Sequence, residues 1–282
     1  MQTNNYHYTK RELDLLQQHL YMITEKILEI CDKHHIQYFI IGGTAIGAYY
    51  WEGFIPWDDD IDIGMTRNNY ERFLTVAPQE LGNKFFLQWY GTEKNTPFWF
   101  AKVRENGTLF RESWFRNIQM HHGIYVDIFP FDKIPKNKLL YRIQSIAFGF
   151  INTCFIGKSI WQWKYCGRCE VDTPRKRGFL PCLLTRLIVT FFSKDTIFRM
   201  LCYTQTMFNN RAVSYCKNIM TTNDIVAIED VRYPRVVNFG RLKMTAPRDL
   251  EKYLHTHYPI LKKYLPQEEQ INHRPAELSF GQ

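Results

Sequence analysis

Two stretches of the chain decide its fold: YFIIGGTAIGA at residues 38–48 and GFIPWDDDIDIG at residues 53–64. In the first, β-branched and aromatic residues end at Gly42 and Gly43 and give way to helix-forming residues, which predicts a strand, a turn and a short helix. The second contains a strand at 61–65 in which apolar and acidic residues alternate. Together they predict a strand–turn–helix unit followed by a strand whose acids share one face.

The rest of the chain predicts an α/β protein of the α+β type. Thr9 and Glu12 have the spacing of a capping box and open an amphipathic helix over 9–33. The same patterns predict helices at 44–51, 67–74, 137–164, 180–210 and 248–257, and strands at 37–41, 85–90, 99–104, 123–129, 225–228 and 236–244. Pro130 is expected to end the strand that precedes it.

The order of these elements suggests three parts. Strands and short helices dominate residues 1–135, which we expect to form the catalytic core. Long helices and basic residues dominate 136–220, and residues 221–282 return to short strands and a helix that we expect to pack back on the core.

The positive charge of the chain is concentrated in one segment. The net charge is +8, yet residues 133–186 carry eleven basic and two acidic side chains, or +9, which leaves −1 for the rest. The apolar run in this segment, residues 143–156, is shorter than the ~20 residues of a transmembrane helix, so we expect no membrane span. Two interpretations stay open: a core helix with a solvated basic face, or a segment lying on an anionic membrane surface. No nucleic-acid-binding motif accompanies the charge, so nucleic acid is not an expected partner.

The cysteines and the first residues bear on the compartment. Seven cysteines, an odd number spread over a long chain, indicate reduced thiols. Cys166, Cys169 and Cys182 have the spacing of part of a zinc site, but a fourth ligand is not apparent near them. Residues 1–11 do not resemble a signal peptide. We therefore expect a cytoplasmic protein, peripheral on the inner face of the cell membrane if the basic segment docks there.

An acidic cluster is the strongest chemical signal. Asp58, Asp59, Asp60 and Asp62 lie within five positions, which is costly unless a cation offsets their repulsion. Asp60 and Asp62 are two apart on a strand, point to one side, and offer the oxygen ligands that Mg²⁺ or Mn²⁺ prefers. Asp127, in the middle of an apolar strand, is the natural third ligand. A solvated acidic turn is the alternative.

Two further groups could bind phosphate. Gly42, Gly43 and Thr44 open a helix, and the backbone N–H groups at a helix N-terminus bind anions. Lys102 and Arg104 are two apart on a strand and face the same way, as either a phosphate site or a solvated pair.

These residues closely resemble the signature of the LicD family. The resemblance rests on residues 38–48 and 53–64 and extends to 102–108, to GIYVDIFPFD at 123–132 and, weakly, to 247–254 and 264–266. It implies a nucleotidyltransferase-type fold, in which a mixed β-sheet is flanked by helices and the site uses a Gly-Gly turn and three acids.

The resemblance also implies a reaction. Family members transfer phosphocholine, or a related phospho-alcohol, from a CDP-activated donor such as CDP-choline to a hydroxyl of a cell-surface glycan in lipopolysaccharide, teichoic acid or capsule. That glycan would be lipid-linked if the chain works at a membrane. The implied metal-binding and catalytic residues are Asp60, Asp62 and Asp127, with Mg²⁺ or Mn²⁺. The implied substrate-binding residues are Gly42, Gly43, Thr44, Trp57, Lys102 and Arg104. Aromatic faces hold quaternary ammonium groups, and the candidates for a choline cage are Trp57, Trp89, Tyr90, Trp99 and Trp114.

Some points stay open at this stage. The insertion from Tyr49 to Trp57 leaves undecided which of Asp58, Asp60 and Asp62 touches metal. Transfer of a nucleotide to a small molecule or protein would use the same acids. A non-catalytic module that binds anionic glycans or lipids is the alternative of another class, and the retention of all three acids argues against it.

Overall fold

The computed structural model describes residues 8–164, 179–219, 224–258, 260–266, 269–270, 272–273 and 275–281. Cys166 and Cys169 lie outside these residues, as does the side chain of Cys182, so the zinc site stays a prediction.

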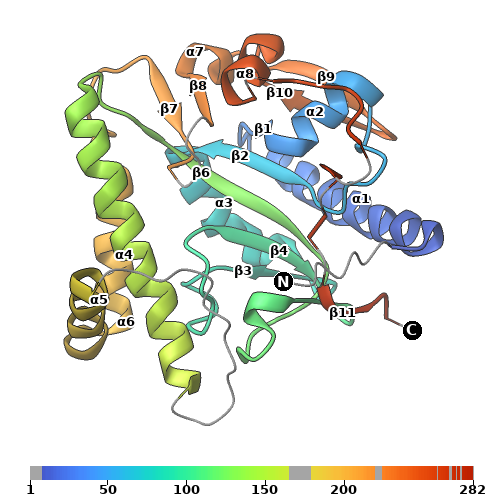
Figure 1. Cartoon of the computed structure of the whole chain (residues 1–282). Coiled ribbons are helices and arrows are strands. Elements are labelled where there is room, and N and C mark those ends of the chain that lie inside the picture. Colours follow the sequence, from blue (N-terminus) through green and yellow to red (C-terminus); the bar gives the residue numbers. More distant parts are fainter. Residues whose placement is uncertain are drawn as a thin grey trace.

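A mixed sheet forms the centre of the described part of the chain (Figure 1). Its strands follow in the order β1 (Phe39–Ile40), β2 (Asp62–Thr66), β6 (Tyr125–Lys133), β4 (Ala101–Glu105) and β3 (Phe85–Gln88), and β7 (Tyr215–Lys217) and β8 (Ile225–Ala227) extend it from the far end of β6. β2 and β6 run parallel, and the other pairs are antiparallel. Together with the surrounding helices, this confirms the α+β class.

Two helices cover one face of the sheet. α1 (Lys10–Lys33) contacts β4 and β6, and α3 (Arg67–Glu80) contacts β2, β3 and β6. On β4, Glu105 points to α1, where its carboxylate is 2.6 Å from His19 Nδ1. Because side chains alternate along a strand, Lys102 and Arg104 point to the opposite face. These two basic residues of β4 thus face away from α1.

The remaining elements form three groups. α2 (Gly42–Trp51) packs with α8 (Leu250–His257) and with the hairpin of β9 (Arg235–Phe239) and β10 (Leu242–Ala246), near α7 (Ile228–Arg232). β5 (Leu109–Glu112), which leads into the 3₁₀ turn Ser113–Phe115, pairs with β11 (Pro275–Ser279). α4 (Lys138–Lys164), α5 (Phe179–Phe191) and α6 (Lys194–Thr206) form a helical layer on the left of Figure 1, on the other side from α1 and α2.

The core has two parts. The larger surrounds the sheet and contains the buried stripe of α1: Leu16, Leu20, Ile23, Ile27 and Ile30. The Thr9–Glu12 capping box at the start of this helix is present, as the sequence predicts. The smaller part lies between α4 and α6 and contains Phe148, Phe155 and Leu201. The helical layer therefore has its own apolar centre. The three-part division of the chain stays a prediction, although β7 returns to β6 directly after this layer.

Several boundaries differ from those expected; α3, for example, ends at Glu80 instead of residue 74. Three further differences have identifiable features. β6 continues through Pro130 to Lys133. A proline is tolerated there because a backbone N–H at position 130 would point toward β4, and β4 pairs with β6 only as far as Ile128, so no ladder hydrogen bond is lost. The helix expected over 180–210 is two helices, since the Ser193 hydroxyl accepts a hydrogen bond from Thr196 N and caps α6. The expected strand at 236–244 is the β9–β10 hairpin.

α4 is longer than its most apolar run. The stretch Lys138–Ser159 has 22 residues with a mean hydropathy of 1.3 and is 28% buried. By length and composition alone it could cross a membrane. The length of the apolar run alone therefore does not exclude a span, and the expectation that the chain has none stays a prediction.

Candidate active site

Three strands each bring one charged side chain to the same level of the sheet. Asp62 on β2 is the register partner of Asp127 on β6, and Lys102 on β4 is the partner of the same aspartate from the other side. Neighbouring strands lie about 4.8 Å apart, so the three side chains are adjacent on one face. Lys102 Nζ is 2.8 Å from Asp127 Oδ1. The structure thus brings together residues that are far apart in the sequence.

The glycine turn lies directly against the acids. A Cβ atom on Gly42 would come within 3.2 Å of Asp62 Oδ2, and one on Gly43 within 2.9 Å of Asp58 Oδ2. Gly42 also has a φ of +55°, which glycine adopts without strain. Thr44 fixes the turn to the strand, because its Oγ1 accepts a hydrogen bond of 2.9 Å from Asp62 N. Larger residues at the two glycines would displace the carboxylates.

The start of α2 offers hydrogen-bond donors beside these acids. α2 begins at Gly42, and the side chain before it makes no capping bond. Gly42 N donates to Tyr253 Oη over 3.2 Å, whereas no described residue accepts from the N–H of Gly43 or of Thr44. Free N–H groups and the helix dipole together favour an anion. An anion site and an acidic cluster therefore adjoin.

Burial and repulsion act on the acids of β2 and the loop before it. Burial raises the pKa of Asp62 well above its usual range, and the charges of Asp60 and Asp127 raise it further. The pKa of Asp58 is raised in the same way by burial, then by Asp60 and by Asp59. These acids are held together against their own repulsion, which a cation would relieve.

The other two acids have partly compensated charges. Burial raises the pKa of Asp60, while the nearby His273 lowers it. Burial raises the pKa of Asp127 to about 6, although the ammonium group of Lys102 acts in the opposite direction. Asp127 is therefore mostly ionised at neutral pH.

The donor set fits a hard divalent cation. Asp58 Oδ2 is buried and has no hydrogen-bond partner among the described residues. Several carboxylate oxygens with no sulfur and little nitrogen among them suit Mg²⁺ or Mn²⁺ better than zinc. The assignment of Asp60, Asp62 and Asp127 as its ligands, with Asp58 as a fourth candidate, stays a prediction.

His273 lies against the same acids, and nothing in the sequence pattern indicated it. Its Nδ1 is 3.1 Å from Asp60 Oδ2, and its backbone N donates to both oxygens of Asp59 at 3.0 and 2.9 Å. The hydrogen bond to Asp59 raises the pKa of His273 to about 10. Asp59, Asp60 and His273 are close enough to bind an ion themselves. However, Asp59 also accepts from Tyr8 Oη, so its oxygens are already well supplied with donors.

Two tyrosines that the sequence pattern did not indicate, Tyr253 and Tyr258, lie against the glycine turn. Tyr253 Oη accepts from Gly42 N and donates to the buried Asp224 over 2.8 Å. Tyr258 lies beside the turn as well, with its hydroxyl 3.9 Å from the position of a Cβ on Gly42. These residues come from α8 and the segments next to it, more than 160 positions away in the chain.

The two expected phosphate ligands on β4 are buried. Lys102 is 1% exposed, and its Nζ lies 3.5 Å from the centre of the Tyr125 ring in addition to its ion pair with Asp127. Arg104 is 0% exposed and donates to the Gly123 carbonyl and to Glu112. Lys102 therefore belongs to the acid cluster, whereas Arg104 lies in an internal network.

The five aromatic candidates for a choline cage are spread over the molecule. Trp57 packs edge-on against Trp51 with ring centres 6.2 Å apart. Trp89 and Trp99 line a cavity of about 540 Å³ between α3 and α6. Tyr90 is buried in the smaller core, and Trp114 is 59% exposed. Of these, Trp57 is next in the chain to the acids.

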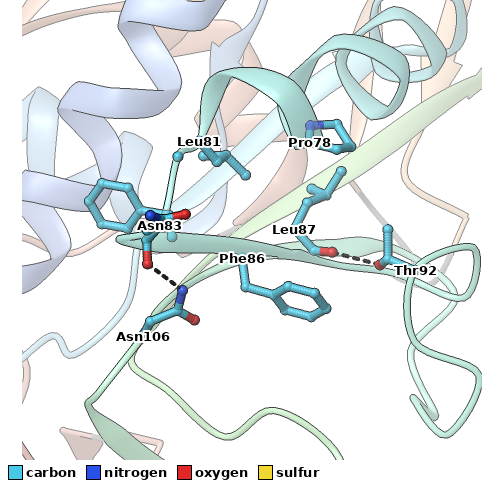
Figure 2. Close-up of a pocket in the computed structure, with 9 residues that line it drawn as sticks. Pro78, Leu81, Asn83, Phe86, Leu87, Thr92 and Asn106 are labelled. Atoms are coloured by element: carbon cyan, nitrogen blue, oxygen red, sulfur yellow. Dashed lines mark hydrogen bonds between the residues drawn. The ribbon is translucent and has the colours of Figure 1, made fainter.

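Figure 2 shows another cavity, of about 340 Å³, beside β3. Pro78, Leu81, Phe86 and Leu87 lie around it, and Asn106 Nδ2 donates to the Asn83 carbonyl at its edge. None of its lining residues has an ionisable side chain, and β4 and β6 lie between β3 and β2 in the sheet. This cavity is separate from the acids.

The chain matches known proteins over the part that carries these acids. Residues 35–148 match the family model described as LicD/FKTN/FKRP, nucleotidyltransferase domain. This part of the chain is therefore similar to the nucleotidyltransferase domain of the LicD family. This confirms the resemblance that the glycine turn and the acidic strand indicate.

Individual relatives agree with this assignment. The chain is 34% identical over 124 residues to the lipopolysaccharide cholinephosphotransferase LicD of Haemophilus influenzae, a match that covers 41% of this chain and 43% of that protein. It is 37% identical over 139 residues to an uncharacterized protein of Rickettsia prowazekii, which covers 47% of each chain. The matches thus span less than half of the length of these curated relatives.

Proposed function

We propose that the chain transfers phosphocholine, or a related phospho-alcohol, from a CDP-activated donor to a hydroxyl of a cell-surface glycan. One observation carries this proposal: the free N–H groups of α2 adjoin the carboxylates of Asp58 and Asp62 at Gly42 and Gly43. A nucleoside diphosphate ester requires both, since its phosphate oxygens bind backbone donors and a metal ion. The similarity to a lipopolysaccharide cholinephosphotransferase supports phosphocholine as the transferred group.

The carboxylates would hold the metal, and the helix would orient the donor. Asp60, Asp62 and Asp127 are the proposed ligands, and a bound Mg²⁺ or Mn²⁺ supplies charge neutralisation to the phosphates. The N–H groups of Gly43 and Thr44 bind phosphate oxygens and hold the diphosphate in place. The absence of a side chain at Gly42 and Gly43 lets the carboxylates of Asp62 and Asp58 lie beside these N–H groups.

Asp127 is also the proposed general base. With a pKa of about 6 it is ionised at neutral pH, and Lys102, 2.8 Å away, stabilises the charge. The acceptor hydroxyl loses its proton to Asp127 while its oxygen forms a bond to the phosphorus of the phosphocholine group. The bond from this phosphorus to the bridging oxygen breaks, and CMP leaves with that oxygen and the bonding electrons.

The two products of this reaction, CMP and the phosphocholine-bearing glycan, define the assay. The full chain is incubated with CDP-choline, Mg²⁺ and a lipopolysaccharide or teichoic acid acceptor, and CMP is measured beside phosphocholine on the glycan. The two products should appear in equal amounts, stop with EDTA and resume with added Mg²⁺.

The same assay separates the other functions. Pyrophosphate release from ATP or CTP, without CMP from CDP-choline, would instead identify a transferase of nucleotides. Binding of the glycan without turnover of any donor would identify a non-catalytic module. CDP-ethanolamine, CDP-glycerol and CDP-ribitol in parallel reactions identify the phospho-alcohol.

A further inference from the structure

The helical layer exposes an unusual amount of apolar surface. On α4, Leu139, Ile143 and Ile146 are 65%, 54% and 62% exposed, and their spacing of four and three places them in one stripe. On α5, Leu187 is 44% and Phe191 is 77% exposed. α5 contacts α4 near Lys158, whose Nζ donates to the Val189 carbonyl, at the other end of α4 from this stripe. We call Leu139, Ile143 and Ile146 the apolar face.

The opposite side of α4 is firmly packed in the protein. Gln144, Phe148 and Phe155 are buried, with the spacing of an inner stripe. Gln144 Nε2 donates to the Thr204 carbonyl of α6 over 2.8 Å. A helix that crossed a bilayer would have to give up this hydrogen bond and the apolar contacts with α6. The packing therefore favours a helix that lies along a membrane over one that spans it.

Charge indicates what covers the apolar face. Between Lys133 and Lys164 the chain has six basic residues and no acid, and Lys138 and Arg142, both exposed, alternate with the apolar stripe of α4. In 179–211 the one acid is Asp195, which is paired with Lys94 at 2.9 Å. A second copy of this chain would bring like charges together. An anionic bilayer offers the complementary charge as well as an apolar layer.

We propose that the apolar face docks the protein on an anionic bilayer, with α4 lying in the interfacial plane. Lipid binding by itself does not depend on the proposed transfer. The role that docking would have in catalysis does rest on the proposed transfer. α4 begins just after β6, and on β6 Asp127 lies six residues, or about 20 Å, from Lys133. Docking would thus hold the acid cluster beside a membrane that carries a lipid-linked acceptor.

Vesicle co-sedimentation of the full chain tests the proposal. Vesicles of pure phosphatidylcholine are compared with vesicles that contain phosphatidylglycerol, at low and at high salt. We expect binding to the anionic vesicles alone, weakened at high salt as the charges are screened. We also expect alkaline carbonate to release the bound protein, as it releases peripheral proteins.

Two double variants separate charge from apolar contact. Lys138→Ser with Arg142→Ser should weaken binding on the order of 30-fold, because each basic residue near the surface contributes about one factor of five. Ile143→Ser with Ile146→Ser should weaken it by about tenfold or more. The matched control, Arg235→Ser with Lys243→Ser on the β9–β10 hairpin, makes the same charge change elsewhere and should bind normally.

Several outcomes would overturn the docking. These are equal binding to neutral and anionic vesicles, an equal loss in the control, or resistance to carbonate, which would indicate a membrane span. Self-association without lipid that the Ile143→Ser and Ile146→Ser changes abolish would assign the face to a second copy. CMP release from soluble CDP-choline should be unchanged in all these variants, so a failure of docking is distinguishable from a failure of the proposed function.

Discussion

Raising the pH should destabilise the metal-free protein, because the buried acids of the cluster must ionise beside one another. For Asp127 the pKa rises from 3.8 to about 6 on folding. At 1.36 kcal/mol per unit this lowers the free energy of unfolding by ~3 kcal/mol. At a pH below the unfolded pKa the carboxyl is protonated in both states and contributes nothing. This loss of stability develops as the pH rises from about 4 through 6. Because the pKa values of Asp58 and Asp62 are raised well above their usual range, these two acids extend the loss of stability to higher pH.

The assay is thermal unfolding in EDTA at pH 5 and at pH 7.5. Between these two pH values Asp127 accounts for ~1.4 kcal/mol of the loss, which for a chain of this size corresponds to a decrease of about 3–6 °C in Tm. Mg²⁺ at pH 7.5 should restore much of this, since a ligand present at 100 times its Kd stabilises by about 2.7 kcal/mol. At pH 5 the effect of Mg²⁺ should be smaller, because protons then compete for the same carboxylates.

Variants isolate the cluster from other titrating groups. Asp62→Asn removes one of the repelling charges, so the metal-free variant should be more stable than the wild type at pH 7.5, respond little to Mg²⁺ and lose turnover. Asp195→Asn makes the same charge change at a side chain that is 55% exposed and should behave as the wild type. A Tm difference between wild type and Asp62→Asn that does not grow with pH, or a full Mg²⁺ response in Asp62→Asn, would refute the reasoning.

Three further perturbations test the turn and the helix caps. Gly43→Ala should abolish turnover in the CDP-choline assay, since its Cβ would lie 2.9 Å from Asp58 Oδ2, whereas Gly149→Ala, with nothing within 4 Å, should retain it. Tyr253→Phe removes the hydroxyl that accepts from the first N–H of α2, and we expect a KM for CDP-choline several-fold higher with the fold retained by circular dichroism. Ser193→Ala removes the cap of α6 and should cost ~1 kcal/mol in urea unfolding; an unchanged midpoint would contradict the capping role.

The sequence predicts the parts of the site that depend on local patterns. The alternation of apolar and acidic residues around Asp62 gives both the strand and the face on which the acid lies. Gly42 and Gly43 between a strand and a helix indicate a close backbone approach, which the structure explains by the carboxylates behind them. Asp127 is indicated by a charge inside an apolar strand, and its position opposite Asp62 follows from strand pairing.

The features that the sequence did not predict depend on contacts between distant segments, and no local sequence pattern indicates such contacts. Asp59 and His273 are 214 positions apart, and neither residue type indicates the other. The burial of Arg104 could not be inferred, because a basic residue on a strand is usually solvated, and here Gln88, Gly123 and Glu112 supply its acceptors. The break before α6 was missed because the apolar pattern continues on both sides of Ser193.

The placement of the acids in the central strand pair has a further consequence. Carboxylates on a mobile loop could separate until their repulsion vanished, and a metal ion would then have to pull them together on binding. Asp62 and Asp127 cannot separate in this way, because each lies in a strand that is bonded to its neighbours in fixed register. The repulsion is therefore kept in the folded protein, and the proposed cation would relieve it without any reorganisation of its ligands. The same rigidity makes the cluster a source of instability when no cation is present, which is why the pH and Mg²⁺ dependence of unfolding reports on the site even before a substrate is known.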